Sequence, residues 1–238
     1  MQFKRYGGGD SAFLCLHGWN GNHATFAPLA AGLPEGVSLW CPDLPQFDSL
    51  DAITSELQHF ASGIGKPLRI IGNCSGALHG LLLAKRIPVE RLVMIDAFAY
   101  WPTYFRMFLT PIAGRIAYLT AFANPLGRWL ANTAVAQHRA ASTDLTEGFR
   151  RVNHAATYRQ LQLLAEMDAP ESFRGLVHEV EIVFGQHSFG AVRRSAQIWQ
   201  SVFPAAKQYE LTGAGHLPIL EATRQLQSIL FQERRCTV

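Results

Sequence analysis

Five residues in the middle of the chain, Gly72-Asn73-Cys74-Ser75-Gly76, constrain the fold most strongly. The apolar run Leu68–Ile71 precedes them, and a second apolar segment, Ala77–Lys85, follows. Glycines two positions before and two positions after Cys74 allow the backbone to bend where side chains would clash. The pattern predicts a buried strand that passes through a tight turn into a helix, with Cys74 at the head of that helix.

Strand-like and helical segments alternate over most of the chain, which predicts an α/β fold with a mostly parallel sheet and helices on both faces. Strands are expected at Phe3–Tyr6, Ala12–Leu16, Val37–Cys41, Leu68–Ile71, Leu92–Ile95, Val180–Phe184 and Lys207–Leu211. Besides the helix after Cys74, helices are expected at Asp51–Ser62 and, closing the chain, at Glu221–Gln232.

The pattern changes between Phe98 and Ser172, where no strand is evident and prolines and glycines interrupt helical stretches. We therefore predict a helical cap, or lid, at residues 98–172, inserted after the strand that ends near Ile95. The remaining residues, 1–97 and 173–238, would form the core. Aromatic side chains crowd the first half of the cap, where they either pack its helices together or cover an apolar pocket.

Composition excludes several classes of protein. With 238 residues, 48% of them apolar, the chain suits one large domain or a domain with an insert. A net charge of +3 is too small to suggest a nucleic-acid partner. The longest apolar stretch, 107–126, is interrupted by proline, glycine and arginine, so no membrane span is expected. The cysteines and histidines show no metal-ligand spacing, so we expect no metal and no cofactor. The four cysteines include no Cys-x-x-Cys pair, so we expect a reducing, cytoplasmic location.

Three segments together resemble the α/β-hydrolase superfamily, over nearly the whole chain. His17-Gly18-Trp19 after an early strand is similar to the family's oxyanion loop. The turn at Cys74 resembles its nucleophile elbow, with cysteine in place of the usual serine. Gly213-Ala214-Gly215-His216 after the last strand resembles its histidine loop. The resemblance implies that Cys74 and His216 are catalytic and that the backbone amides of Trp19 and Ser75 form an oxyanion hole.

Cys74 and Ser75 compete for the role of nucleophile. Both positions that flank the turn are glycine if Cys74 is central, whereas Asn73 would crowd the turn if Ser75 were central. A free thiol ionises with a pKa of about 8.5, far below that of a hydroxyl. A helix N-terminus and a nearby imidazolium both favour the thiolate. We therefore predict Cys74 as the nucleophile and His216 as its base; the alternative is a small buried cysteine without a chemical role.

The acid of the site departs from the common family pattern. The usual carboxylate follows the penultimate strand in a Gly-x-x-Asp setting, but this chain has Gly185-Gln186-His187-Ser188 there. A few family members, such as the haloalkane dehalogenases, carry the acid directly after the strand that follows the elbow helix, where this chain has Asp96. The resemblance thus implies that Asp96 orients His216. Asp43, Asp48, a dyad without an acid and a purely structural Asp96 stay open.

These features predict an enzyme that cleaves an ester or thioester of a hydrophobic or aromatic acyl group through a covalent acyl-Cys74 intermediate. The substrate is expected to be a small molecule or a carrier-bound acyl group. His17, Trp101, Phe105 and Phe108 are the predicted pocket residues. Two alternatives stay open: an acyltransferase, condensing or lyase enzyme on the same fold, and a non-catalytic ligand-binding protein.

Overall fold

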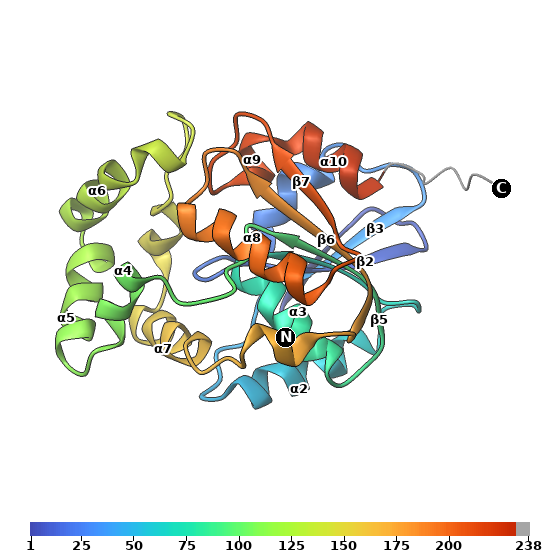
Figure 1. The fold of residues 1–238 in the computed structure, drawn as a ribbon, viewed down its shortest axis with the longest axis horizontal. Coiled ribbons are helices and arrows are strands. Elements are labelled where there is room, and N and C mark those ends of the chain that lie inside the picture. The colour runs from blue at the N-terminus through green and yellow to red at the C-terminus, as the bar shows by residue number, and fades with distance from the viewer. Residues whose placement is uncertain (232–238) are drawn as a thin grey trace.

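The computed structural model describes residues 1–231, and its centre is a seven-stranded sheet with the strand order β1-β3-β2-β4-β5-β6-β7 (Figure 1). β1 pairs with β3 in antiparallel fashion, and all other neighbours are parallel. The strands are β1 (Phe3–Tyr6), β2 (Ser11–Leu16), β3 (Val37–Pro42), β4 (Arg69–Asn73), β5 (Val89–Ile95), β6 (Val177–Gly185) and β7 (Lys207–Leu211). This arrangement confirms the predicted mostly parallel α/β sheet flanked by helices.

Ten α-helices lie in the part of the chain that the structure describes. They are α1 (Ala27–Ala30), α2 (Leu50–Ala61), α3 (Ser75–Ala84), α4 (Thr103–Arg106), α5 (Ala113–Tyr118), α6 (Pro125–Ala134), α7 (His154–Leu164), α8 (Gly190–Val202), α9 (Pro218–Glu221) and α10 (Thr223–Phe231). Helical turns of 3-10 or π geometry are found at His23–Phe26, Met107–Leu109, Leu119–Ala123, Ala136–His138, Glu147–Arg151 and Pro170–Phe173.

Helices cover both faces of the sheet because successive strand residues point to opposite sides. In β5, Leu92 and Met94 face the core cluster shared with α2, α3 and α8. Val93 and Ile95 face the second cluster, which α1 and α10 cover. The strands at the centre of the sheet are therefore apolar on both faces, as expected for parallel strands buried between two helical layers.

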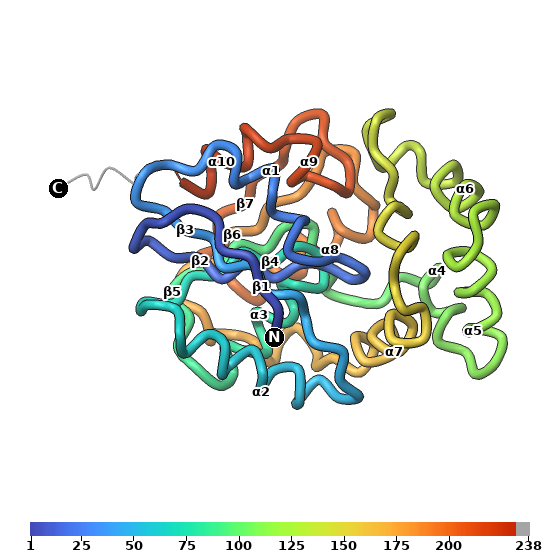
Figure 2. Tube along the Cα trace, turned by 180° about the vertical axis from the view of Figure 1, so that it is seen from behind, coloured from blue at the N-terminus to red at the C-terminus, as the bar shows by residue number. Residues whose placement is uncertain are grey.

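Residues 98–172 contribute no strand and hold helices α4–α7. In both views these helices lie together at one end of the molecule, beside the sheet (Figures 1 and 2). Tyr118, Phe149, Tyr158 and Leu161 form a buried cluster of their own within this segment. We call residues 98–172 the helical segment; its role as a separate cap stays a prediction.

The predicted closing helix is wrong in one respect, because the chain bends at Ala222, where φ is −136° and ψ is 39°. Glu221 therefore ends α9, and α10 begins at Thr223. The Glu221 carboxylate accepts hydrogen bonds from the backbone of Gly215 and Ala140 and from the Thr143 hydroxyl. The last predicted helical residue, Gln232, lies outside the described residues. Within residues 1–231 no helix has both the length and the apolar character needed to cross a bilayer.

Candidate active site

The turn between β4 and α3 holds Cys74 in an unusual backbone conformation, with φ 51° and ψ −117°. Few residues other than glycine adopt a positive φ. A Cβ atom on Gly72 would lie 2.3 Å from Cα of Ala77, and one on Gly76 would lie 1.9 Å from the carbonyl oxygen of Leu16. Both glycines are thus required by close backbone approach, and Cys74 stands at the N-terminus of α3 where the sequence pattern put it.

Asp96 follows β5 directly and is almost completely buried, with 1% of its surface exposed. Its Oδ1 atom accepts a hydrogen bond of 3.0 Å from the backbone N–H of Gly185. Its Oδ2 atom lies 2.8 Å from Nδ1 of His216 and accepts a second hydrogen bond of 2.6 Å from Oγ of Ser188. The carboxylate is therefore fixed on both oxygens and contacts the histidine ring.

The two other carboxylates that the sequence left open lie elsewhere. Asp43 accepts a hydrogen bond of 2.7 Å from the backbone N–H of His23 and lies 2.9 Å from the Nδ1 atom of the same residue. Asp48 is exposed. Asp96 is the carboxylate that contacts His216.

His216 stands in the loop after β7, anchored by a backbone hydrogen bond of 2.8 Å to the carbonyl of His138. The edges of Phe98 and Phe189 contact its ring, at centroid distances of 5.7 and 4.8 Å. Burial alone would lower the pKa of His216. Hydrogen bonding and charge interactions with Asp96 and Cys74 outweigh burial and raise that pKa to about 10. The raised pKa favours the protonated form of the ring.

The loop after β2 packs against the elbow. A Cβ atom on Gly18 would lie 3.0 Å from Cβ of Cys74, so a side chain at position 18 would crowd the elbow. The Trp19 indole anchors the loop to the helical segment through a hydrogen bond of 2.8 Å to the carbonyl of Thr157. Ser75 is the first residue of α3, where helix geometry leaves the backbone N–H without an intrahelical partner. This geometry is compatible with an oxyanion hole formed by the amides of Trp19 and Ser75.

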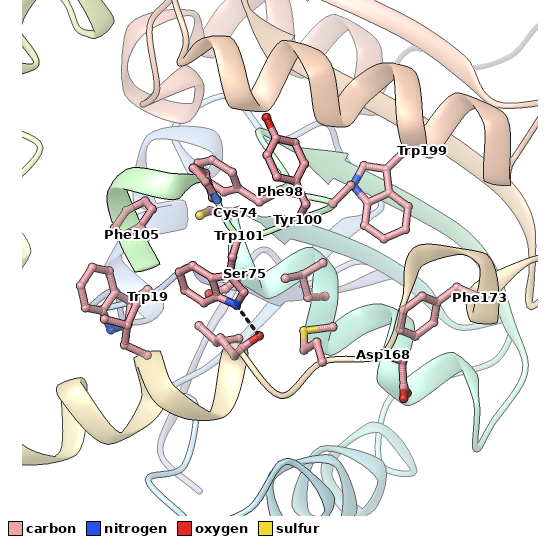
Figure 3. A pocket seen from close by; sticks show the side chains of 16 residues that line it. Trp19, Cys74, Ser75, Phe98, Tyr100, Trp101, Phe105, Asp168, Phe173 and Trp199 are labelled. Carbon is pink, nitrogen blue, oxygen red and sulfur yellow. Dashed lines mark hydrogen bonds between the residues drawn. The ribbon is translucent and has the colours of Figure 1, made fainter. Parts of the chain in front are cut away.

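A mainly apolar cavity of about 120 Å³ adjoins Cys74 (Figure 3). Trp101 and Phe105, two of the predicted pocket residues, line it. Other lining residues come from distant parts of the chain: Trp19, Ser75, Leu78, Phe98, Ala99, Tyr100, Pro102, Leu161, Leu164, Met167, Asp168, Phe173 and Trp199. Most of these were missed by sequence reasoning. Leu78 was detectable, because it lies one helical turn after Cys74 and so shares its face of α3.

Two predicted pocket residues, His17 and Phe108, are not among those that line the cavity. The ring of His17 is buried; Nδ1 lies 2.8 Å from the carbonyl oxygen of Gly18, and Nε2 accepts a hydrogen bond of 2.9 Å from the backbone of Leu44. Both ring nitrogens therefore bind backbone rather than face the cavity. Phe108 packs against the rings of Phe105 and Phe122. Within residues 1–231 no group of three histidine, cysteine or acidic side chains is placed to hold a metal ion.

Comparison with known proteins agrees with the fold described above. Residues 13–226 match the model of the alpha/beta hydrolase family. A pimeloyl-[acyl-carrier protein] methyl ester esterase of Xylella fastidiosa strain M23 is 27% identical over 241 residues, covering 92% of this chain and 93% of that protein. The same enzyme from strain M12 is 25% identical, with the same coverage.

Solved structures resemble the fold at lower identity. A thermophilic esterase from Thermogutta terrifontis has a TM-score of 0.77 at 16% identity, over 96% of this chain and 90% of that one. The enol-lactonase from Burkholderia xenovorans LB400 has a TM-score of 0.74 at 14% identity, over 96% and 94%. At such identities the likeness shows the fold alone.

Proposed function

Because the chain belongs to the alpha/beta hydrolase family, we propose that it is an esterase-type hydrolase whose nucleophile is the thiol of Cys74. The observation that carries the proposal is the contact of 2.8 Å between Oδ2 of Asp96 and Nδ1 of His216. The imidazole ring of His216 also interacts with Cys74. Asp96 thus contacts His216, and His216 interacts with Cys74, which lines a mainly apolar cavity. This set of contacts supports covalent catalysis.

The raised pKa of His216 sets the roles of His216 and Cys74 in the first half of the reaction. The Cys74 thiolate attacks the carbonyl carbon of the ester and forms a C–S bond, and the carbonyl oxygen becomes an oxyanion. Backbone amides of Trp19 and Ser75 would stabilise that oxyanion. When the intermediate collapses, the C–O bond to the leaving group breaks and the imidazolium of His216 gives its proton to the departing alkoxide. His216 therefore acts as an acid before it acts as a base.

The second half of the reaction reverses the role of the histidine. Once Cys74 carries the acyl group as a neutral thioester, Asp96 still raises the pKa of His216 but the charge of Cys74 no longer does, so the neutral ring becomes easier to form. The neutral ring can then remove a proton from water as the water oxygen attacks the thioester carbonyl. The C–S bond breaks, the carboxylic acid leaves, and the thiolate returns with His216 protonated. Asp96 orients the ring through both steps.

The cavity supports a substrate with an apolar acyl chain. Its walls consist largely of aromatic and aliphatic side chains, such as Trp101, Phe105 and Leu164. Relatives that cover nearly the whole chain are named for hydrolysis of a carrier-bound methyl ester. We therefore propose an ester of an apolar acyl chain, as a small molecule or on a carrier, with a thioester as a further chemically open substrate.

Ester hydrolysis by two single variants tests this proposal. Cys74→Ala is expected to abolish turnover of a medium-chain methyl ester, whereas Ser75→Ala, which keeps the backbone amide, is expected to retain most of it. The two alternatives from the sequence predict other results. An acyltransferase would release the acid slowly and respond to added thiol or alcohol acceptors, and a ligand-binding protein would bind the ester without cleaving it. Equal loss of activity in both variants would contradict the assignment of Cys74.

A further inference from the structure

Three tryptophan indoles line the cavity beside Cys74, and one of them differs from the others. The Trp19 N–H donates a hydrogen bond to the carbonyl of Thr157, and the Trp101 N–H donates one of 3.2 Å to the carbonyl of Leu164. The indole N–H of Trp199 is buried and has no hydrogen-bond partner among the described residues. Buried donors are almost always satisfied in proteins, so this one calls for an explanation.

The Trp199 side chain is held firmly in place. It belongs to α8, is 1% exposed, and packs against the rings of Phe173 and Phe203. Figure 3 shows its nitrogen edge turned toward the side of the pocket on which Tyr100 and Cys74 lie. A fixed donor that faces a mainly apolar pocket marks the place of one acceptor atom on a ligand.

We propose that the Trp199 N–H binds an oxygen atom within the acyl chain of the substrate, remote from the ester carbonyl that Cys74 attacks. The substrate class is thus an ester of an acyl chain that carries a second, internal oxygen acceptor, such as a keto or a second ester carbonyl. This inference rests on the proposed esterase function and adds to it how the protein recognises the acyl chain of the substrate.

The electrostatics of the wall indicate that the acceptor is neutral. No lysine or arginine is among the described residues that line the cavity, and Asp168 is the one ionisable carboxylate there. Asp168 is itself paired with Lys85, at 2.6 Å. A buried carboxylate on the acyl chain would lack a cationic partner, and burying an unpaired charge is costly. A neutral carbonyl needs only the single donor that Trp199 supplies.

Paired substrates test the proposal. Methyl esters of one straight chain are compared with esters of the same chain carrying a keto group at successive carbons. The wild-type protein is expected to prefer one keto isomer over the plain ester by about tenfold in kcat/KM, the size of one net neutral hydrogen bond. Trp199→Phe keeps an aromatic ring but removes the N–H, and is expected to bring that preference to within about twofold.

Two control variants separate this effect from a general loss of packing. Trp101→Phe removes an N–H that already has a protein partner, and is expected to change both substrates alike. Trp40→Phe removes a buried N–H that also lacks a partner among the described residues but does not line the cavity; it should leave the keto preference intact. A preference that survives in Trp199→Phe, or that falls equally in all three variants, would overturn the proposal.

Binding to the Cys74→Ala protein keeps this test independent of catalysis. The primary amides of the plain and the keto acid serve as unreactive ligands in calorimetry. Tighter binding of one keto amide, lost in the Trp199→Phe, Cys74→Ala double variant, would support the subsite even if no ester were hydrolysed. Equal binding of plain and keto amides, combined with ester turnover by the wild-type protein, would reject the subsite and leave the esterase function standing.

Discussion

Oγ of Ser188 donates a hydrogen bond of 2.6 Å to Oδ2 of Asp96, the same oxygen that lies 2.8 Å from Nδ1 of His216. Ser188 stands after β6, where the common family pattern has the acid, and Asp96 stands after β5 on the neighbouring strand. The serine thus fills the usual position of the carboxylate and fixes its replacement. We infer that Ser188 is a positioning residue that acts on His216 through Asp96.

The first prediction ranks these two residues by kcat/KM. Asp96→Asn is expected to lower kcat/KM about 100-fold. The same change in a serine triad lowers the rate about 10⁴-fold, and the loss is smaller here because a thiol ionises with less assistance from an acid–histidine pair. Ser188→Ala is expected to lower it about fivefold, because the Gly185 N–H still holds the other carboxylate oxygen. Steady-state kinetics on one ester, with circular dichroism as a folding control, measures both. Full activity in Asp96→Asn would assign Asp96 a structural role only.

A second prediction concerns the relocation of the acid. Oγ of Ser188 lies 3.3 Å from Nδ1 of His216, so a carboxylate at position 188 can reach the ring. The double variant Asp96→Asn, Ser188→Asp is expected to recover at least about tenfold of the activity lost in Asp96→Asn. The matched control is Ser188→Asn on the same background, which should recover nothing. Equal activity of the two double variants would show that a charge after β6 cannot serve this histidine.

The third prediction concerns stability against pH. The pKa of His216 is raised from 6.5 to about 10, so between these values the folded protein keeps a proton that the unfolded chain releases. The contribution of this group to the free energy of unfolding is therefore complete below pH 6.5 and is lost as the pH rises toward about 10. Urea unfolding across this window should show a smaller decline for Asp96→Asn, which loses part of the upward shift. Parallel curves for the two proteins would contradict the raised pKa.

The fourth prediction concerns the elbow backbone. Gly76→Ala would bring a Cβ atom to 1.9 Å from the carbonyl oxygen of Leu16, and backbone atoms cannot yield cheaply. We expect a loss of about 2–3 kcal/mol in the free energy of unfolding, measured by chemical denaturation. Gly65→Ala is the control, because nothing lies within 4 Å of its added Cβ; it should change stability by no more than about 0.5 kcal/mol.

Local patterns in the sequence predicted the parts of the site that depend on local geometry. The glycines around Cys74 and His216 specify turns that only a few conformations satisfy, so the order of motifs indicated both residues. Strand starts were harder to place. β5 begins at Val89 rather than at Leu92, because Glu90 and Arg91 pair with Arg69 and Glu181 and so tolerate a position in the sheet.

The contacts between distant elements could not be predicted from the sequence in the same way. From the sequence, Ser188 indicated only that the acid of the family pattern is absent from this position. Nothing local in the sequence reveals that its hydroxyl donates a hydrogen bond to Asp96, a carboxylate that follows the neighbouring strand. Nothing in the sequence singled out Trp199 as a residue of the site. Its unpaired N–H becomes visible only when α8 is placed beside the loop that follows β5. Pocket walls combine side chains from many elements, so periodicity along one element does not identify them.

The most direct test of the central claim is mass spectrometry of the protein quenched in acid during turnover of a methyl ester. We predict that the acyl group is found on the peptide that contains Cys74 and is released by hydroxylamine, as expected for a thioester. Cys74→Ala should show no such adduct. An acyl group found on Ser75 of the wild-type protein would contradict the account. Undiminished ester hydrolysis by the Cys74→Ala protein would contradict it as well.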